Sequence, residues 1–219
     1  GWHWMRLRYN DCTHIMTTTE TMVKILKEKG FKQEIIAWTR GVDREYFKPD
    51  PNRKPNQKKK LLCVSRISHE KGLDDFCELK IPNTEKILVG DGPYLKTLKK
   101  KYPDVVFAGK RKGHDLAQYY QQADVFVFPS KNDTFGVVQI EAMACGTPVA
   151  GYPVPGPIDV IKNGINGHIE KNISLAVNQA LHLDRQKVYQ SSLVWSWENA
   201  YKQFKNVLLP AKPQNGKNK

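Results

Sequence analysis

The sequence predicts an α/β fold in which a doubly wound parallel sheet carries helices on both faces. Short runs rich in valine, isoleucine and phenylalanine alternate, along most of the 219 residues, with stretches whose apolar residues recur at helical spacing. Glycine and proline separate these runs, and strands that alternate with helices form parallel sheets. A hydrophobic fraction of 40% is enough to build the core of such a domain.

The first part of the chain is predicted to hold two strands with a helix between them. Residues 14–19 and 34–38 have the character of strands, and residues 20–30 show helical spacing that ends at Gly30. The segment 49–60 is rich in proline, asparagine and lysine, so we expect a linker or an exposed loop there.

From residue 60 onward strands and helices alternate. Strands are predicted at 60–67, 85–90, 104–109, 124–130 and 148–154, and helices at 69–80, 94–102, 114–123 and 136–146. Residues 157–169 are predicted to contain a turn and a short return strand. Roughly the last 40 residues are predicted to be helices that end in a basic tail.

These elements divide the chain into three parts. Residues 46–209 are predicted to form one Rossmann-like domain. Residues 1–45 supply only one or two βα units, so we expect them to be the end of a preceding, mostly missing domain together with its linker. Residues 210–219 are expected to be a disordered basic tail.

The formal net charge is +13, and the lysines gather at 48–60, at 96–113 and in the tail. A solvated basic surface, a nucleic-acid site and docking on an anionic membrane all give such a charge. No aromatic residues alternate with these lysines, so nucleic-acid binding is the least favoured of the three.

The sequence shows no membrane-spanning or secretory segment. No apolar run reaches the roughly 20 residues that cross a bilayer, and the start lacks the order of a signal peptide. The cysteines form no CxxC pair, and we interpret all of them as buried free thiols in a reducing compartment: Cys12, Cys63, Cys77 and Cys145. We therefore expect a cytoplasmic protein, with peripheral docking on the cytoplasmic face of the membrane as the alternative.

Three strand ends carry candidate chemistry, and ligands of open parallel sheets bind at such ends. Arg66 ends one strand and Lys71 follows five residues later, a pair of cations that suits a diphosphate. Two solvated surface cations are the alternative. Gly90 and Gly92 would let backbone approach a ligand, although turn formation alone also explains them. Neither a P-loop nor the usual dinucleotide fingerprint is present, and no histidines or cysteines have the spacing of metal ligands.

The stretch "SKNDTFGVVQIEAMACGTP" at 130–148 holds the third strand end. A helix that begins near Gly136 would point its unpaired amides, near Phe135 and Val137, at the crevice beyond the sheet and so form an anion site. Glu141 is an acid in an otherwise apolar helix, which favours a binding role because a buried unpaired carboxylate is costly. Asp133 just ahead of the helix is either part of the site or a helix N-cap.

The same stretch resembles the acid-x7-Glu signature of retaining GT-B glycosyltransferases of family 4. The segments "CVSRISHEKGLDDF", "VGDGPY", "ADVFVFPS", "WTRGVDREYFKP" and "WSWENAYKQF" are similar to the same family, and the resemblance covers about residues 12–209. It implies that the chain is the C-terminal, donor-binding half of a GT-B fold. The phrase "AGYPVPGPIDVI" further resembles the bacterial subgroup related to GDP-mannose-dependent α-mannosyltransferases and sulfoquinovosyl-lipid synthases.

The resemblance implies a role for each part of the acidic stretch. Glu141 binds the ribose hydroxyls, and Asp133 takes the acidic position that hydrogen-bonds the donor sugar. The amides of Phe135, Gly136 and Val137 meet the diphosphate or the sugar. The family usually has glutamate where this chain has Asp133, which leaves the sugar open.

The resemblance also implies roles for the basic residues. Arg66 and Lys71 neutralise the diphosphate as it leaves, Gly90 lies at the donor, and Lys110 lies near the base. Neither a cofactor nor a metal is then required, because the two cations supply the positive charge. Where the family often has Gly-Gly-x-x-Glu, this chain has Gly156 and Asp159 in "PGPID".

We therefore expect a retaining hexosyltransferase that moves a sugar, by our inference mannose, from a GDP- or UDP-linked donor to a lipid or glycan hydroxyl. A donor-binding fragment without turnover and a basic protein of nucleic-acid or membrane surfaces are the alternatives. Because most of the acceptor domain is missing, we also expect an exposed apolar patch around residues 12–38 and 195–204.

Overall fold

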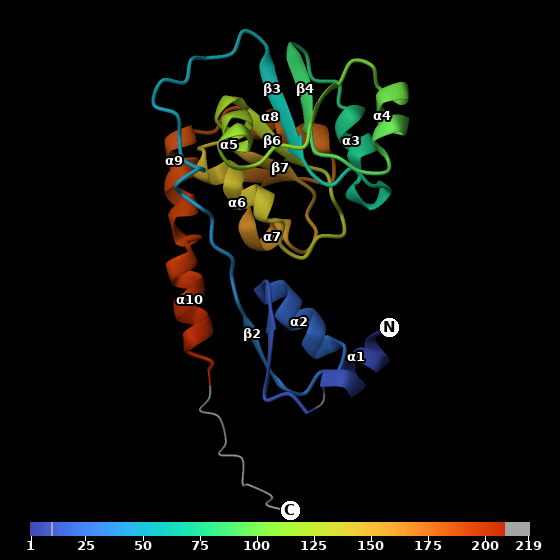
Figure 1. Ribbon diagram of the computed structural model, residues 1–219, viewed down its shortest axis with the longest axis vertical. Coiled ribbons are helices and arrows are strands. Elements are labelled where there is room, and N and C mark those ends of the chain that lie inside the picture. Colours follow the sequence, from blue (N-terminus) through green and yellow to red (C-terminus); the bar gives the residue numbers. More distant parts are fainter. Residues whose placement is uncertain (10, 209–219) are drawn as a thin grey trace, which may run out of the picture.

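The computed structural model describes residues 1–9 and 11–208, as a large α/β domain next to a small N-terminal segment (Figure 1). The strands are β1 (His14–Thr17), β2 (Glu34–Ala37), β3 (Lys59–Val64), β4 (Thr84–Val89), β5 (Val106–Gly109), β6 (Val125–Phe128), β7 (Val149–Gly151) and β8 (Gly167–Ile169). The helices are α1 (Trp2–Tyr9), α2 (Glu20–Glu28), α3 (Leu73–Cys77), α4 (Leu95–Lys101), α5 (Gly113–Gln122), α6 (Val137–Ala144), α7 (Pro157–Val160), α8 (Ile173–Ala180), α9 (Arg185–Ser191) and α10 (Trp197–Lys205).

The large domain is built on a parallel sheet of six strands in the order β5-β4-β3-β6-β7-β8. From β3 the chain adds β4 and β5 on one side, and it then crosses back to place β6, β7 and β8 on the other. The point where the order reverses lies between β3 and β6, which is where ligands bind in doubly wound sheets. The predicted doubly wound, Rossmann-like fold is confirmed.

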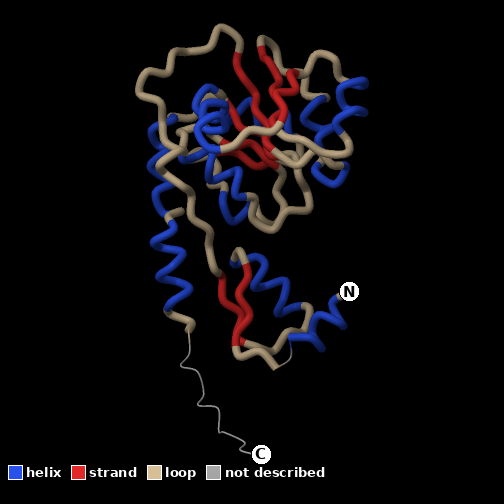
Figure 2. Tube along the Cα trace, in the orientation of Figure 1, coloured by secondary structure: helices blue, strands red, loops and turns tan. Residues whose placement is uncertain are grey.

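The alternation of side chains along the strands builds a core on each face of the sheet. Leu61 and Cys63 of β3 point to one face and share a buried cluster with residues of α3, α4 and α8. Leu62 points to the other face, where its cluster includes Tyr120 of α5 and Ile140 of α6. Successive strand residues therefore bury opposite faces, and the sheet is covered on both sides (Figure 2).

The N-terminal segment pairs β1 and β2 in parallel, from His14 opposite Glu34 to Thr17 opposite Ala37. Helix α2 covers this pair through a small apolar cluster, and its first turn is capped by the Thr19 hydroxyl, which accepts from the Met22 amide. The strand–helix–strand order is the one predicted.

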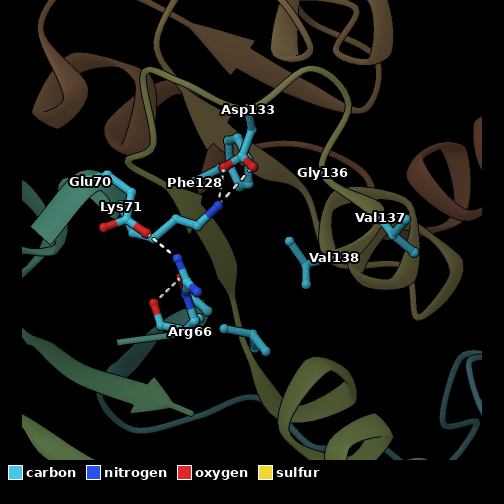
Figure 3. Close-up of a pocket in the computed structure, with 10 residues that line it drawn as sticks. Arg66, Glu70, Lys71, Phe128, Asp133, Gly136, Val137 and Val138 are labelled. Carbon is cyan, nitrogen blue, oxygen red and sulfur yellow. Dashed lines mark hydrogen bonds and ion pairs between the residues drawn. The ribbon is translucent and has the colours of Figure 1, made fainter. Parts of the chain in front are cut away.

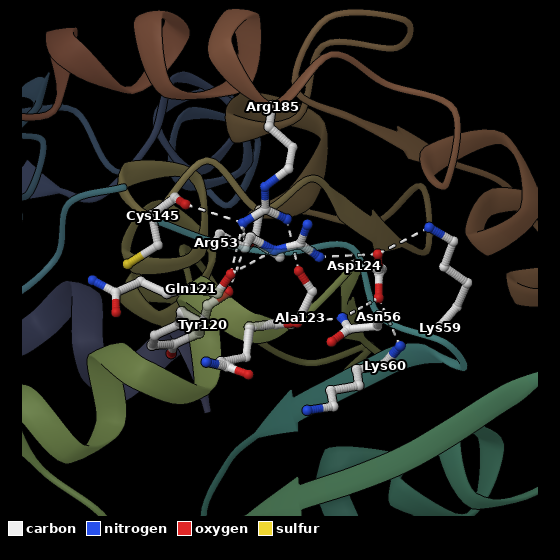
Figure 4. Close-up of polar contacts among 12 residues, drawn as sticks. Arg53, Asn56, Lys59, Lys60, Tyr120, Gln121, Ala123, Asp124, Cys145 and Arg185 are labelled. Carbon is white, nitrogen blue, oxygen red and sulfur yellow. Dashed lines mark hydrogen bonds and ion pairs between the residues drawn. The ribbon is translucent and has the colours of Figure 1, made fainter. Parts of the chain in front are cut away.

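The basic segment 49–60 is tied to the end of helix α5 and the start of β6 (Figure 4). Asp124, just before β6, accepts hydrogen bonds from the side chains of Arg53 (3.0 Å), Asn56 (2.7 Å) and Lys59 (3.2 Å), and from the Lys60 amide. Arg53 and Asn56 also donate to carbonyls at the end of α5. Part of this basic segment therefore pairs with groups inside the protein. The interpretation of the charge as a solvated basic surface did not anticipate these pairs.

Arg185, the first residue of α9, holds the same helix end from the other side (Figure 4). Its guanidinium donates to the carbonyls of Ala123 (2.6 Å), Gln121 (3.0 Å) and Cys145 (3.2 Å), and to the Thr147 hydroxyl. Burial lowers the pKa of Arg185 to about 10. Arg53 and Arg185 thus both donate to the Gln121 carbonyl, and Asn56 donates to the Gln122 carbonyl, two carbonyls at the end of α5 that no residue of the helix can bind.

Helix α10 returns from the large domain and runs beside β2 (Figure 1). The Trp38 indole donates to the Ala200 carbonyl at 2.9 Å, and the Trp38 ring lies 5.5 Å from the ring of Phe204. Thr39 donates to Gln203 through both its amide and its hydroxyl. The last helix therefore packs against the first part of the chain.

The expected apolar patch is found in one of its two predicted stretches. Within 195–204, Trp197, Tyr201 and Phe204 are exposed. Among the described residues of 12–38 no large hydrophobic side chain is exposed, because they pack on α2 and α10. Other exposed apolar side chains flank the two stretches: Trp2, Trp4, Met5, Leu7, Tyr9, Leu193, Val194 and Leu208.

Several local predictions differ from the structure. The helix predicted at 69–80 is a 3₁₀ turn, His69–Lys71, followed by the short α3, because Gly72 adopts a left-handed φ of 63° between them. The strand predicted within 157–169 is β8, which runs parallel to β7 because α7 first carries the chain back. Cys12 is exposed, so only three of the four cysteines are buried. The predicted tail at 210–219 lies outside the described residues.

Candidate functional site

A cavity of about 380 Å³ opens at the carboxyl ends of β3 and β6 (Figure 3). Its walls come from the end of β3 and the turn after it, from Phe128 at the end of β6, and from the start of α6. The lining residues are Val64, Ser65, Arg66, Glu70, Lys71, Phe128, Asp133, Gly136, Val137 and Val138. The switch point of the sheet thus brings together Arg66, Lys71, Asp133, Gly136 and Val137, all of which the sequence proposes.

Both predicted cations that line the cavity already have a carboxylate partner. Lys71 donates to both oxygens of Asp133, at 2.8 and 3.0 Å, and so joins the turn after β3 to the loop after β6 (Figure 3). Arg66 forms a hydrogen-bonded ion pair with Glu70 one helical turn later. Asp133 is therefore an ion-pair partner and not the N-cap of α6, which was the alternative.

Glu70 is a site residue that the sequence interpretation missed. The hydroxyl of Ser68 donates to it at 2.7 Å, and with the backbone amide of Glu70 and the Arg66 side chain it lowers the pKa of this carboxyl to about 2. The feature of the sequence that could have identified Glu70 is its i, i+4 spacing from Arg66, which favours an ion pair in a helical turn.

The start of α6 lines the cavity with Gly136, Val137 and Val138. Gly136 is the N-cap, it has a φ of 77°, and no side chain caps the helix there. A Cβ on Gly136 would lie 2.7 Å from the Phe128 ring, so glycine is required both by the conformation and by the space. The first amides of an α-helix have no partner within the helix, so this end can bind an anion.

Four of the predicted site residues do not line the cavity: Phe135, Glu141, Gly90 and Lys110. The Phe135 ring is buried and packs edge-on against Trp195 at 5.4 Å, so only its backbone is near the site. A Cβ at Gly90 would lie 1.9 Å from the Ser65 carbonyl oxygen, which supports the turn interpretation of that glycine. Lys110 is exposed at the end of β5.

Glu141 has a partner within the protein. The hydroxyl of Tyr120, a fully buried residue of α5, donates to its Oε2 atom at 2.9 Å. Burial raises the pKa of Glu141, and the hydrogen bond from Tyr120 lowers it in part. The premise that this acid lacks a partner was wrong, and sequence reasoning missed Tyr120 because it lies 21 residues away.

The N-terminal segment contacts the loops that surround the cavity. The Thr18 hydroxyl donates to the Thr134 carbonyl at 3.0 Å, and Thr21 donates to Asp159 through its amide and its hydroxyl. A Cβ at Gly156 would lie 2.8 Å from the Asp133 carbonyl oxygen, so the "PGPID" loop packs directly on the acidic loop.

No three histidine, cysteine, aspartate or glutamate side chains gather as a metal site in the part of the chain that the structure describes. Over the same residues, no helix has both the length and the apolar character needed to cross a membrane.

Comparison with known proteins identifies the family. A sequence profile of the family described as "Glycosyl transferases group 1" matches residues 45–188, more than half of the chain. The chain belongs to this family. The resemblance seen in the acidic stretch is thereby confirmed.

Two curated relatives illustrate the likeness. The chain is 34% identical over 176 residues to a GDP-mannose-dependent alpha-mannosyltransferase of Corynebacterium glutamicum, covering 76% of this chain and 42% of that one. It is 35% identical over 148 residues to sulfoquinovosyl transferase SQD2 of Arabidopsis thaliana, covering 61% of this chain and 29% of that one. The chain therefore spans less than half the length of these two relatives.

Solved structures share the fold at lower identity. Sucrose-phosphate synthase of Thermosynechococcus elongatus has a TM-score of 0.79 at 22% identity, over 94% of this chain and 60% of its own. The pneumococcal O-GlcNAc transferase GtfA, in complex with UDP and GlcNAc, has a TM-score of 0.76 at 18% identity, over 94% of this chain and 46% of its own. These neighbours have the GT-B fold, so the predicted fold class is confirmed.

Proposed function

We propose that this chain is the donor-binding part of a retaining glycosyltransferase that moves a hexose from a nucleoside-diphosphate sugar to a hydroxyl acceptor. The observation that carries the proposal is the cavity at the switch point, where Arg66, Lys71 and the uncapped start of α6 face one space. Two cations and a helix N-terminus suit a diphosphate, and Asp133 beside them suits a sugar hydroxyl.

The diphosphate enters a site whose charges are already paired. Arg66 and Lys71 carry two positive charges, and Glu70 and Asp133 carry two negative ones. When Lys71 turns to phosphate, Asp133 is released to accept hydrogen bonds from the sugar. Glu141, held by Tyr120, accepts from the ribose hydroxyls, with Gly90 and Lys110 farther along the donor.

The reaction then breaks the bond between the anomeric carbon and the phosphate oxygen, and the electron pair leaves with the diphosphate. Arg66, Lys71 and the amides of Gly136 and Val137 stabilise the charge that grows there. The acceptor hydroxyl attacks from the same face, which retains the configuration, and its proton passes to the leaving phosphate. No side-chain base and no metal take part.

The names of the relatives support mannose as the sugar. The corynebacterial protein is named as a GDP-mannose-dependent mannosyltransferase, whereas the pneumococcal transferase was crystallised with UDP. We propose a GDP- or UDP-linked donor and a lipid or glycan acceptor, used in the cytoplasm or at its membrane face. The net charge of +13 would favour an anionic membrane surface.

A panel of GDP-, UDP- and ADP-sugars, read by thermal shift, tests donor binding. A specific donor stabilises the fold in proportion to the logarithm of its concentration over Kd, about 2.7 kcal/mol at 100 times Kd. We expect one base to stand out and the sugar to add to its nucleotide. If no member of the panel shifts the midpoint, the proposal is wrong.

Donor binding without transfer is the second candidate function. It is favoured by the share of the relatives that the chain spans, because GT-B enzymes work in a cleft between two domains. Binding of a nucleotide sugar with no transfer to any acceptor would support it.

A further inference from the structure

Gln139, in the first turn of α6, is a polar residue with no contact to solvent. Its exposed fraction is 0%, and its neighbours belong to the apolar core. The side-chain Nε2 donates to the Phe135 carbonyl oxygen at 2.5 Å, whereas the Oε1 atom is buried and has no partner. An apolar side chain of similar size would avoid the unfavourable burial of this oxygen.

The hydrogen bond from Gln139 fixes the orientation of one peptide group. The peptide between Phe135 and Gly136 is trans, so its carbonyl and its N–H point in opposite directions. Because the carbonyl of Phe135 points to the buried amide of Gln139, the N–H of Gly136 points away from the core.

Gly136 borders both the packed core and the cavity. A Cβ there would meet the Phe128 ring at 2.7 Å and the Gln139 amide nitrogen at 2.8 Å, so the space beside its Cα is filled. Gly136 also lines the cavity, together with Phe128, Arg66 and Lys71. Its N–H, which points away from the Gln139 amide, is therefore the backbone donor that a ligand in the cavity could reach.

We propose that Gln139 is a positioning residue of this site, which holds the Gly136 N–H toward a phosphate of the bound nucleotide. The inference rests on the proposed function, since it requires a nucleoside diphosphate in the cavity. It explains why a fully buried glutamine with an unpaired oxygen occupies the first turn of a helix that is apolar apart from Gln139 and Glu141: the residue serves the loop before the helix and not the core.

Gln139→Met tests the proposal, because methionine has a similar length and cannot donate a hydrogen bond. We expect its affinity for UDP or GDP, whichever the unmodified chain binds, to fall about tenfold in calorimetry, as for the loss of one well-placed hydrogen bond to a charged group. Affinity for the matching nucleoside, uridine or guanosine, should stay the same. The midpoint of thermal unfolding without ligand should not fall, because the unpaired oxygen is removed.

Gln179→Met is the matched control. Gln179 of α8 also has a buried Oε1 atom without a partner, and α8 contributes no residue to the cavity. This variant should bind both the diphosphate and the nucleoside as the unmodified chain does.

Gln139→Glu separates positioning from packing, because only its protonated carboxyl can donate to the Phe135 carbonyl. Its diphosphate affinity, taken relative to the unmodified chain at each pH, should therefore recover as the pH is lowered from 8 to 5. A ratio that does not change with pH would count against the hydrogen bond.

The outcomes separate the inference from the proposed function. Equal diphosphate affinity in Gln139→Met and the unmodified chain overturns the inference alone. A fall that is equal for diphosphate and nucleoside, with a lower thermal midpoint, also overturns it, because the residue is then only structural. If the unmodified chain binds neither UDP nor GDP, the proposed function and this inference are both overturned.

Discussion

Tyr120 and Glu141 form a buried donor–acceptor pair that sets the charge state of a proposed ribose contact. Burial raises the pKa of the Tyr120 hydroxyl well above its usual value, and the neighbouring Glu141 raises it further, so this group stays a donor. It holds one oxygen of Glu141 and opposes the effect of burial on the acid. The pair therefore keeps a half-buried carboxylate ionised at a lower pH than burial alone would allow.

Replacing Tyr120 by phenylalanine should shift the pH dependence of nucleoside binding. The pKa of Glu141 then rises, and a protonated carboxyl accepts poorly from two ribose hydroxyls, so affinity should fall off at a higher pH than in the unmodified chain. Well above both pKa values the two proteins should bind alike. Calorimetric titration of the nucleoside between pH 5 and 8 measures this.

The neighbouring substitution Tyr119→Phe on α5 is the control and should leave the curve in place. Superimposable pH curves for Tyr120→Phe and the unmodified chain would mean that Glu141 does not bind ribose through its ionised form.

Arg66→Ala and Lys71→Ala should each weaken nucleoside-diphosphate binding by about tenfold or more, the worth of a hydrogen bond between charged groups. Both residues line the cavity, and Lys71 also holds Asp133. Nucleoside affinity should change little. Lys131→Ala is the control, because Lys131 pairs with Asp75 and does not line the cavity. Equal losses for nucleoside and diphosphate would show that the two cations do not bind phosphate.

The sequence predicted the site residues that follow from strand ends, and it missed those that depend on packing. Arg66, Lys71, Asp133 and Gly136 meet because parallel strands end at one edge of the sheet. The partners Glu70 and Tyr120 could not be assigned in the same way. A side-chain partner across two helices depends on rotamers and helix packing, which no periodicity in the sequence records.

At the scale of secondary-structure elements, the end of helix α5 is the point where three parts of the large domain are joined. Asp124 accepts hydrogen bonds from the segment 49–60, and Arg185 of α9 donates to carbonyls at the same helix end. Although burial raises the pKa of Asp124, the hydrogen bonds from the Lys60 amide, Asn56 and Lys59 and the charge of Arg53 lower it overall. The ionised Asp124 carboxylate thus holds the segment 49–60 together with the bonds from Arg53 and Asn56 to the carbonyls of α5.

Asp124→Asn should lower the free energy of unfolding by roughly 2–3 kcal/mol at pH 7, because an amide offers hydrogens to side chains that are themselves donors. The folded pKa of Asp124 is depressed, so its contribution is full above the unfolded value of about 3.9 and is lost as the pH falls through the folded value. The difference between the two proteins should therefore shrink between pH 5 and pH 2. Urea unfolding at several pH values measures it.

Asp104→Asn is the control for this prediction. Asp104 also has a lowered pKa, mainly from its hydrogen bond with Lys86, but its side chain is 64% exposed. It should change stability by less than about 1 kcal/mol. A difference between Asp124→Asn and the unmodified chain that stays constant down to pH 2 would contradict the role of the ionised carboxylate.

Most elements could be predicted because their signals are local. Each strand of the large domain overlaps the stretch in which it was predicted. The helix predicted at 69–80 reads as continuous until the left-handed conformation of Gly72 breaks it. The internal partners of segment 49–60 were missed because Asp124 lies more than 60 residues away.

On the scale of the whole molecule, the chain crosses between the large domain and the N-terminal segment twice, at nearly the same place. The first crossing follows β2, and the second precedes α10; the Val42 amide donates to the Trp195 carbonyl at 3.2 Å where they meet. Gly41 is packed there, since a Cβ would lie 2.3 Å from the Trp197 nitrogen. Any movement of one part against the other has to bend both crossings together.

We predict that the chain binds its donor but transfers sugar at less than about 1 per second, the low end of ordinary turnover. It spans 42% of the corynebacterial relative, and the proposed function requires a second domain that binds the acceptor. A chimaera that adds the part of that relative not covered by this chain should transfer faster. The assay follows labelled mannose from GDP-mannose into a lipid extract of Corynebacterium glutamicum. Rapid transfer by the chain alone would refute the prediction.

The return of α10 to β2 has a consequence for the order in which the protein is made. Trp38 and the Ala200 carbonyl that it contacts are 162 residues apart, and ribosomes add about 5–20 residues per second. The surface around Trp38 therefore stays uncovered for roughly 8–32 s after Trp38 is added to the chain, until α10 has been synthesised. All strands of the large domain are synthesised in that interval. The surface around Trp38 is thus completed only after the large domain has been synthesised, and until then its uncovered tryptophan is a surface that chaperones can bind.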